Sequence, residues 1–531
     1  MKFKSFTTLY LLSLLFVGLG YISFLPAFEG FDETAHISRV REYAHSLDGL
    51  FKKDAFLDKS IVNYSGPLPY SSGTPPFDKG MTYPNFFADE SRLKDYTHKY
   101  ASAPFDAPFV PSDQLNWQSQ HPPLFYLLLA PVMRSMDGIP FLHQVFVLRF
   151  CSYLLALAGV AMGLLAVQRL GRDGALVSDQ HWGFIAYPIL FPMFFLEFAR
   201  VGNDSLCCLL VGAIFYSMCN WLTGNKTTLS LTLVGILIGL GLLTKAFFIP
   251  ILAATIFFLL LSYFRNGVSL LAIKHASRDA GLVLGPALLI GGAWYLFKFI
   301  YFGDLGLGSE ANQIKDFNVL QLWGNFSLIP LFRGLVVCVV TFFWAGTWSL
   351  VHMPHALLFF LCLGGLVFGY HALKALLDLP MNHYTWLASW LLLFFFVSLF
   401  FHVLLSQFLS GSGVSGGWYL HILMPITAPA LGLAFNKALS QTRKSSYRLI
   451  FYYALTFHML ALLALFGVFS GYLIKLMDKS LGYVNSELSF HTFIDLFERL
   501  TIVSMPSFSL LAFVGGFLCA VKLFNNLTNT K

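Results

Sequence analysis

The sequence predicts an all-α protein, a polytopic bundle of about twelve helices that cross a membrane. Apolar residues make up 56% of the chain and charged residues only 11%, and the mean hydropathy is +0.67. Both properties differ strongly from those of an average soluble domain. The third observation is a series of apolar runs of about twenty residues, the length that a helix needs to cross a bilayer.

The apolar runs predict one integral membrane domain over 1–531. The first run, 6–28, is longer than the apolar part of a signal peptide and lacks a small-residue cleavage site, so we expect an uncleaved helix. A mostly polar loop over 29–144 carries juxtamembrane helices, including a short apolar one near 122–136. A second loop and a semi-apolar segment cover 302–350. Further crossing helices are predicted at 145–168, 182–199, 204–222, 228–244, 247–264, 280–301, 353–375, 383–408, 417–436, 449–474 and 501–523.

The lysines and arginines of the short loops predict the orientation. With these helices, the short loops on the side of Lys2 and Lys4 hold most of the cations, and the opposite short loops are poor in them. The positive-inside rule then makes both termini cytoplasmic, in a bacterial inner membrane, and turns both long loops toward the periplasm. The net charge of +7 is scattered between apolar runs, so it does not indicate a nucleic-acid partner.

The pair Asp32-Glu33 is the most informative polar feature, because it follows the first apolar run where the chain leaves the lipid. Carboxylates there are costly unless they stay hydrated or meet a partner. Asp32 and His36 are spaced to share one helix face, which suits a general base or a metal ligand. Alternatively, Asp32 only caps the helix and Glu33 is favoured by the helix dipole.

Four more polar groups are predicted on the same side of the membrane. His121 precedes two prolines and would lie at a helix N-terminus, which attracts phosphate, although for His121 alone an incidental histidine at a helix start is the better interpretation. Arg200 and Asp204 belong to a polar turn between two predicted crossing helices. They can face a common site, or they can only pair and cap the next helix. Lys245 either snorkels to the membrane surface or binds a lipid-linked phosphate.

The remaining candidates accompany aromatic residues or histidines. Lys298 ends a predicted crossing helix among aromatic residues, where interfacial anchoring is the plainer interpretation. Tyr419 and His421 open a late crossing helix and could line a cavity or belong to the interfacial aromatic belt. Asp32, His36 and His352 also supply ligand atoms that suit a divalent metal ion, so a metal cofactor stays open.

The order of the motifs is more specific than any motif alone. FDETAH follows the first apolar run, QHPPLFYLLLAP closes the loop and LRFCSYLLAL opens the next helix; FARVGNDSL, GLLTKAF, AWYLFKFIYFGD and GGWYLHILMP follow. Over roughly residues 1–440, this series resembles the GT-C superfamily of integral membrane glycosyltransferases. It is most similar to the bacterial branch of protein-O-mannosyltransferase-like and aminoarabinose-transferase-like enzymes.

The resemblance implies a sugar donor linked to a polyprenyl phosphate, held among membrane lipids, and a periplasmic acceptor that is a glycan, a lipid or a protein. By resemblance, Asp32 would act as the catalytic base on the acceptor hydroxyl, and Glu33 would assist it or orient the acceptor. The residues implied in donor or substrate binding are His36, His121, Arg200, Asp204, Lys245, Lys298, Tyr419 and His421. The chain departs from the family where relatives often read G-R-Y-L, because Trp418 replaces the arginine, and where Phe31 replaces a frequent proline.

The residue types suit this chemistry independently of the resemblance. A carboxylate can take the proton of an acceptor hydroxyl, and cations or a helix N-terminus can stabilise a departing phosphate. One displacement without an enzyme nucleophile inverts the anomeric carbon. Two rival functions are a transporter or flippase of lipid-linked sugars, which needs polar residues near mid-bilayer, and a catalytically inactive scaffold, which Trp418 would favour.

Overall fold

The computed structural model describes most of the chain. The described residues are 3–67, 83, 86, 89–172, 187–189, 191–224, 227–265, 267–303, 328–349, 351, 353, 358–366, 370, 383–410, 416–439, 444–470, 473–475, 481–483, 502 and 507–529. Helices dominate these residues, so the predicted all-α class is confirmed. The described strands form two small antiparallel sheets, one of β1 (Phe56–Asp58) and β2 (Pro111–Leu115), the other of β3 (Leu473–Lys475) and β4 (Leu481–Tyr483).

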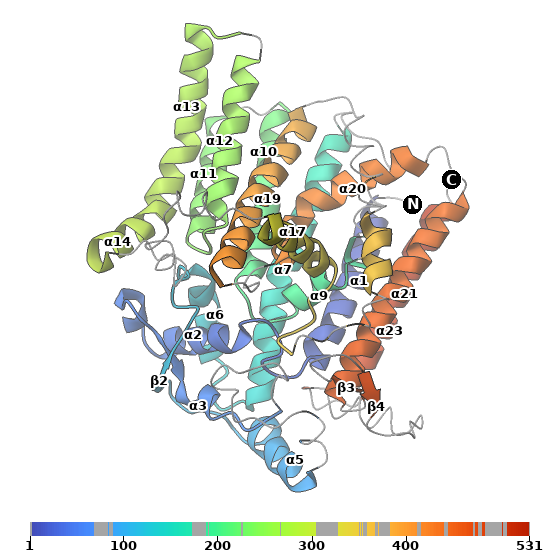
Figure 1. Ribbon diagram of the computed structural model, residues 1–531. Helices are drawn as coiled ribbons and strands as arrows, with labels where there is room; N and C mark the ends of the chain where they lie inside the picture. Colours follow the sequence, from blue (N-terminus) through green and yellow to red (C-terminus); the bar gives the residue numbers. More distant parts are fainter. Residues whose placement is uncertain are drawn as a thin grey trace.

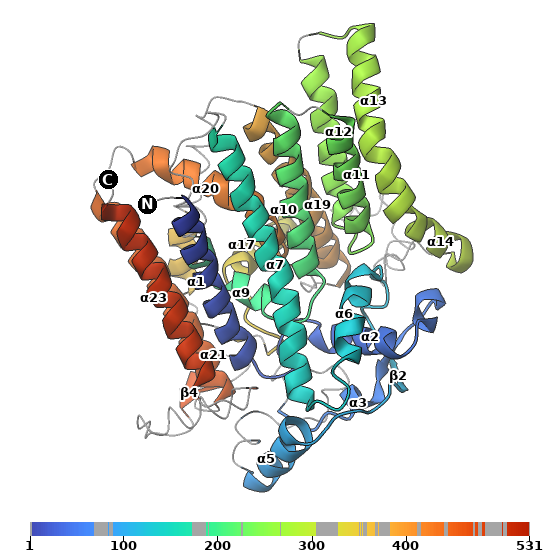
Figure 2. The same cartoon turned by 180° about the vertical axis from the view of Figure 1, so that it is seen from behind.

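Figures 1 and 2 show the helices as a bundle with the first loop gathered at one end. The helices up to the middle of the chain are α1 (Phe3–Phe24), α2 (Glu33–His45), η1 (Asp48–Phe51), α3 (Lys59–Val62), α5 (Glu90–Tyr96), η3 (Thr97–Ser102), α6 (Leu124–Arg134), α7 (Phe141–Arg172), α9 (Met193–Phe198), α10 (Asp204–Leu222), α11 (Thr228–Leu242) and α12 (Phe248–Phe264). The later helices are α13 (Leu270–Ala287), η5 (Leu288–Gly292), α14 (Ala293–Phe302), α17 (Leu328–Phe343), α19 (His383–Ser410), η6 (Gly417–Leu423), α20 (Met424–Leu439), α21 (Lys444–Phe469) and α23 (Phe508–Asn529).

Seven helices in the described part of the chain are long and apolar enough to cross a membrane. They are Thr7–Phe24, Phe141–Leu170, Asp204–Leu222, Leu270–Phe302, His383–Leu405, Phe451–Phe469 and Phe508–Asn526. The apolar helices α11, α12 and α17 are shorter. In the predicted crossing at 182–199, the structure describes 187–189 and 191–199, where α9 has only six residues. Much of the predicted crossing at 353–375 and much of the predicted segment 302–350 lie outside the described residues. The total of twelve crossings therefore stays a prediction.

Small residues set how closely the membrane helices pack. α7 and α10 make the most extensive helix contact in the described bundle, and Gly159 and Gly212 face each other there. A Cβ at Gly159 would lie 2.4 Å from the Cys208 carbonyl oxygen, and one at Gly212 would lie 2.3 Å from the Gly159 carbonyl oxygen. Small residues allow membrane helices to approach in this way, and the close contact holds α10 against α7.

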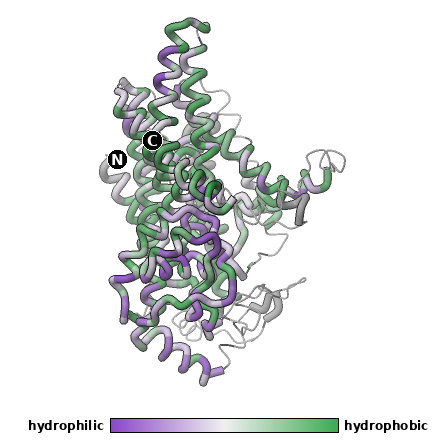
Figure 3. Tube along the Cα trace, turned by 90° about the vertical axis from the view of Figure 1, so that its left-hand side faces the viewer, coloured by the Kyte–Doolittle hydropathy of each residue, from purple (hydrophilic) through white to green (hydrophobic). Residues whose placement is uncertain are grey.

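The first loop covers one end of the bundle, where hydrophilic residues are concentrated (Figure 3). α2 lies against α6, and a buried ion pair of 2.6 Å joins Arg41 of α2 to Asp58 at the end of β1. The short helix predicted at 122–136 is α6, which follows the two prolines. α1 begins, and α23 ends, at the opposite end of the bundle (Figure 1), which agrees with an even number of crossings.

The structure corrects two local predictions. The predicted crossing at 280–301 begins earlier, because α13, η5 and α14 form one continuous run from Leu270 to Phe302. Asp32 does not share a helix face with His36, because α2 begins at Glu33 and Asp32 stands just before it with φ of 58° in the left-handed region. Such positions cost an Asp less than most residues, since its short polar side chain tolerates this conformation.

Candidate active site

Asp32 is a partly exposed carboxylate just before the first residue of α2. Its side chain makes no capping hydrogen bond to the helix, so the capping alternative is not observed. Instead, Trp117 Nε1 donates to Asp32 Oδ1 at 2.7 Å. Burial raises the pKa of the Asp32 carboxyl, whereas this hydrogen bond and the charges of Arg200 and Lys245 oppose the rise. A carboxylate with a raised pKa is a better proton acceptor than an ordinary aspartate.

Glu33, the neighbouring carboxylate, is completely buried. Arg149 of α7 binds both of its oxygens, at 2.7 Å through Nε and 2.5 Å through Nη2. The backbone N–H groups of Phe28 and Val201 each donate to it at 3.0 Å. Arg149 also donates to the carbonyl oxygens of three residues at the end of α1, which are Ile22, Leu25 and Pro26. These contacts favour a positioning role, in which Glu33 joins the start of α2 to α1, α7 and the turn before α10.

Arg200, Asp204 and Lys245 form a buried charged network beside Asp32. Arg200 Nη2 contacts Asp204 Oδ2 at 3.1 Å, and Lys245 Nζ contacts Asp204 Oδ1 at 2.8 Å. Arg200 also binds Glu197 at 2.6 Å and donates from Nη1 to the carbonyl oxygen of Phe31 at 2.7 Å. Because Phe31 directly precedes Asp32, this bond ties the network to the candidate base. Asp32, Arg200, Asp204 and Lys245 therefore lie in one neighbourhood, and the Arg200–Asp204 pair is also the contact that the alternative interpretation predicts.

Lys245 lies between α11 and α12, where its ammonium is almost fully buried. Its Nζ is 4.3 Å from the ring centroids of both Phe247 and Tyr419. Although burial disfavours the charged form, the Asp204 carboxylate holds the pKa of Lys245 above its ordinary value. Lys245 is thus kept positive by Asp204 and held by two aromatic rings, which is not the environment of a snorkelling side chain.

His36 and His121 lie face to face at the edge of this network. Their ring centroids are 6.3 Å apart with an interplanar angle of 11°, and His36 Nδ1 is 2.9 Å from the Tyr126 hydroxyl. Burial lowers the pKa of His36 well below its ordinary value, and burial with the nearby Lys245 charge lowers the pKa of His121 to about 3. Both rings are therefore neutral at physiological pH, so they can offer hydrogen bonds, and the positive charge comes from Arg200 and Lys245.

The other candidates lie in different surroundings. Lys298 donates to the Lys52 carbonyl oxygen at 3.2 Å and lies over the rings of Trp294 and Phe302. His421 is buried, with one ring nitrogen 3.0 Å from the Tyr187 hydroxyl and the other 3.0 Å from the Phe342 carbonyl oxygen. These contacts suit a packing role for His421.

A metal site has limited support among the described residues. No group of three His, Cys, Asp or Glu side chains in them could hold a metal ion. Asp32 binds Trp117 and His36 binds Tyr126, and His352 lies outside the described residues. We therefore assign no step to a metal.

Three further residues at the site were not predicted from the sequence. Arg149 and Trp117 bind Glu33 and Asp32 directly. Glu29 is buried and accepts hydrogen bonds from the hydroxyls of Tyr83 at 2.6 Å, Ser349 at 2.6 Å and Thr347 at 2.7 Å. An arginine inside an apolar run is the one signal that could have identified Arg149, because such residues are rare without a partner.

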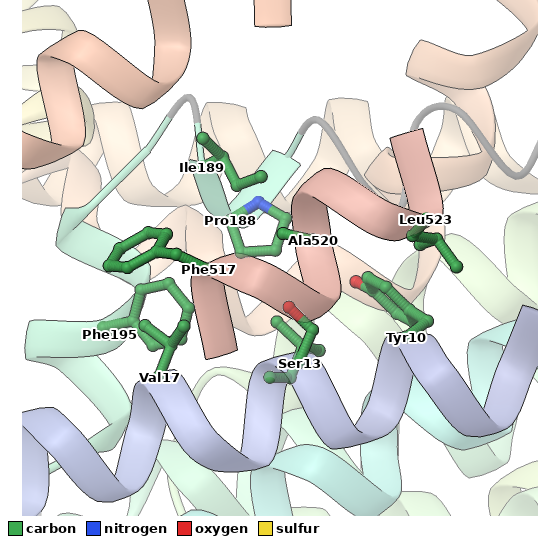
Figure 4. Close-up of a pocket in the computed structure, with 10 residues that line it drawn as sticks. Tyr10, Ser13, Val17, Pro188, Ile189, Phe195, Phe517, Ala520 and Leu523 are labelled. Atoms are coloured by element: carbon green, nitrogen blue, oxygen red, sulfur yellow. The ribbon is translucent and has the colours of Figure 1, made fainter. Parts of the chain in front are cut away.

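A small apolar cavity lies away from these charges, between α1, α9 and α23 (Figure 4). Phe195, Phe517 and Val17 line it, and the Ser13 hydroxyl at its edge donates to the Gly516 carbonyl oxygen at 2.9 Å. The lining also includes the polar residue Tyr10, but most of it is apolar, and we interpret the cavity as imperfect packing between membrane helices.

Comparison with known proteins gives two similar structures, both of ArnT from Cupriavidus metallidurans. The apo structure has 12% sequence identity and a TM-score of 0.46, over 99% of this chain and 77% of the ArnT chain. The structure bound to undecaprenyl phosphate has 12% identity and a TM-score of 0.45, over 98% of this chain and 76% of the ArnT chain. No family model and no curated protein matches the chain. ArnT is an aminoarabinose transferase of the GT-C family.

Proposed function

We propose that the protein is a membrane glycosyltransferase of the GT-C type that transfers a sugar from a polyprenyl-phosphate donor to an acceptor hydroxyl. The observation that carries this proposal is the partly exposed Asp32 beside the buried cations Arg200 and Lys245. A base for the acceptor and positive charge for the departing phosphate are the two elements that this reaction requires.

The proposed reaction is a single displacement. The acceptor oxygen attacks the anomeric carbon while the bond from that carbon to the phosphate oxygen breaks. The electron pair leaves on the polyprenyl phosphate, next to Lys245, and the hydroxyl proton passes to Asp32. Because no bond to the enzyme forms, the anomeric carbon is inverted. Asp204 keeps Lys245 charged and in place, and Glu33 positions the start of α2 that carries Asp32.

The place of the charges in the bundle favours a transferase over a transporter. α10 begins at Asp204, α11 ends at Leu242 and α12 begins at Phe248, so the network stands where helices meet the first loop. A transporter would instead hold its substrate near mid-bilayer. We place this end on the periplasmic side of a bacterial inner membrane, with both termini in the cytoplasm, following the distribution of cations in the short loops.

Binding of undecaprenyl phosphate to the full chain in lipid nanodiscs tests the donor assignment. We expect it to raise the melting temperature of the wild type and to raise that of Lys245→Ala far less, because a ligand that binds only the folded state stabilises it. Lys274→Ala is the matched control, since Lys274 is exposed on α13. Equal stabilisation of the wild type and Lys245→Ala would remove Lys245 from the proposed phosphate site.

The acceptor can be sought without knowing its identity. Mass spectrometry of glycans and lipids from cells with and without the protein would show the acceptor and the mass of the added sugar together. We expect one envelope component to lose the mass of a single sugar when the protein is absent. Identical glycan and lipid profiles would contradict a transferase function.

A further inference from the structure

Four aromatic side chains, which we call the aromatic wall, form a connected cluster beside the candidate base. They are Phe31, Trp117, Trp348 and Trp418. Phe31 and Trp418 stack with centroids 5.3 Å apart and an interplanar angle of 13°, and Trp117 and Trp348 stack at 6.2 Å and 21°. Phe31 meets Trp348 edge to face at 6.1 Å, which joins the two pairs into one surface.

The aromatic wall is attached directly to Asp32. Phe31 is its neighbour in the chain, and Trp117 donates the hydrogen bond to Asp32 Oδ1. The Asn116 side chain, next to Trp117, donates to the Ala35 carbonyl oxygen of α2 at 2.9 Å. The same helix start therefore holds the carboxylate and one pair of rings.

Buried Glu29 fixes the segment that carries Trp348. The backbone N–H of Trp348 donates to the Glu29 carbonyl oxygen at 2.8 Å. The Glu29 carboxylate accepts the hydroxyls of Thr347 and Ser349, on either side of Trp348, and the hydroxyl of Tyr83. Burial raises the pKa of Glu29 and these hydrogen bonds oppose the rise. A buried polar network of this kind holds a surface in place before a ligand arrives.

The four rings are only partly buried, so part of their surface is open to a ligand. A pyranose ring is the ligand that this surface suits. One face of such a ring carries C–H bonds whose hydrogens are slightly positive, and these are attracted to the negative face of an aromatic ring. The hydroxyls at the rim of the sugar would then be within reach of the carboxylate.

We propose that the aromatic wall binds a pyranose ring of a saccharide acceptor and presents one of its hydroxyls to Asp32. This inference rests on the proposed function, to which it adds the class of acceptor. The acceptor must touch the base, and Trp117 is bonded to the base itself. The cations, by contrast, are gathered around Asp204, which places the phosphate end of the donor on that side. The acceptor is accordingly a glycan or glycolipid, and not a protein hydroxyl.

Tryptophan fluorescence of the full chain in nanodiscs tests the proposal, with methyl pyranosides and short neutral oligosaccharides as probes. We expect at least one probe to change the fluorescence saturably. Trp418→Ala and Trp348→Ala should each weaken its binding by about tenfold or more, and Trp418→Phe should retain most of it. Trp390→Ala is the control, because Trp390 packs on Phe257 of α12 with centroids 4.6 Å apart. Melting temperatures check that each variant folds.

Two results would overturn the proposal: no saccharide in the panel changes the fluorescence saturably, or binding survives both alanine substitutions. A competition experiment distinguishes binding of an acceptor saccharide from binding of the donor sugar. We expect the saccharide still to bind when the protein is saturated with a hexosyl polyprenyl phosphate, and competition between the two would assign the aromatic wall to the donor sugar instead.

The proposed function can fail independently of this inference. Undecaprenyl phosphate should stabilise Trp348→Ala as much as the wild type, because Trp348 packs on Phe31 and Trp117 at the acceptor side of the site. If undecaprenyl phosphate fails to stabilise even the wild type while saccharides bind the aromatic wall, the donor assignment is wrong and saccharide recognition stands.

Discussion

Replacing Asp32 with asparagine separates a catalytic base from a structural carboxylate. The amide oxygen of asparagine can still accept the hydrogen bond from Trp117 Nε1, and no helix-capping bond is lost because none is present. Asparagine also tolerates the left-handed φ of 58° at this position. We therefore expect the stability of Asp32→Asn to stay within about 1 kcal/mol of the wild type.

The expected effect on turnover is much larger. A positioned general base contributes about 10²- to 10⁴-fold to a rate, which corresponds to about 3 to 5.5 kcal/mol of activation free energy. The assay is the release of polyprenyl phosphate from a hexosyl polyprenyl phosphate in membranes supplied with an envelope glycolipid extract. Asp113→Asn is the matched control, because Asp113 is exposed on β2, and it should leave turnover unchanged.

Near-normal turnover of Asp32→Asn would refute the role of Asp32 as the base. If Asp32→Asn retains turnover within about tenfold of the wild type, the proton has another acceptor. The buried Glu33 and Asp204 already bind cations, so the proposed mechanism itself would then fail. Stabilisation by undecaprenyl phosphate must be intact in the variant, which shows that a loss of turnover is not a loss of donor binding.

Three further outcomes test the site and the topology. Lys245→Ala should lower turnover and donor affinity together, because a cation beside the phosphate acts in both ground and transition states; a turnover and donor affinity equal to the wild type would exclude this role. Asp32 must be deprotonated to act, so activity should fall as pH drops through its raised pKa. In Trp117→Phe, the carboxylate loses a hydrogen-bond donor and its pKa rises further. The fall in activity at low pH should therefore begin at a higher pH in this variant. A cysteine replacing exposed Glu90 should react with an impermeant thiol reagent added outside spheroplasts, whereas one replacing Lys274 should not, and the opposite labelling would reverse the orientation.

The fold class and the gathering of charges could be predicted from the sequence. The length of the apolar runs alone identifies membrane helices, because lipid offers no hydrogen-bond partners and the backbone must form its hydrogen bonds within a helix. The order of helices places Asp32, Arg200 and Lys245 at one membrane surface, and motif order indicates that they act together. Their convergence in the structure follows from this shared level in the bundle.

The finer assignments could not be predicted, because they depend on contacts between segments far apart in the chain. Asp32 and Glu33 are adjacent and chemically alike, so the sequence does not distinguish their roles. Helix periodicity placed Asp32 and His36 on a common face, which is wrong because α2 begins one residue later than expected. Glu33 is buried and paired because Arg149, 116 positions further along the chain, binds its carboxylate. Asp32 is held in its partly exposed position by the hydrogen bond from Trp117, 85 positions further along the chain.

The two departures from the family pattern explain each other in this structure. Phe31 and Trp418 are the positions where this chain replaces a frequent proline and a frequent arginine, and their rings stack on each other at 5.3 Å. A tryptophan cannot supply the arginine's charge, but Arg200 and Lys245 already provide two cations near Asp32. The exchange therefore need not abolish a phosphate site, and it adds flat apolar surface beside the base. The two rings are paired, partly exposed and next to Asp32, which is the arrangement that the proposed acceptor site requires. Trp418, the residue that favoured an inactive scaffold in the sequence, thus fits the proposed acceptor site.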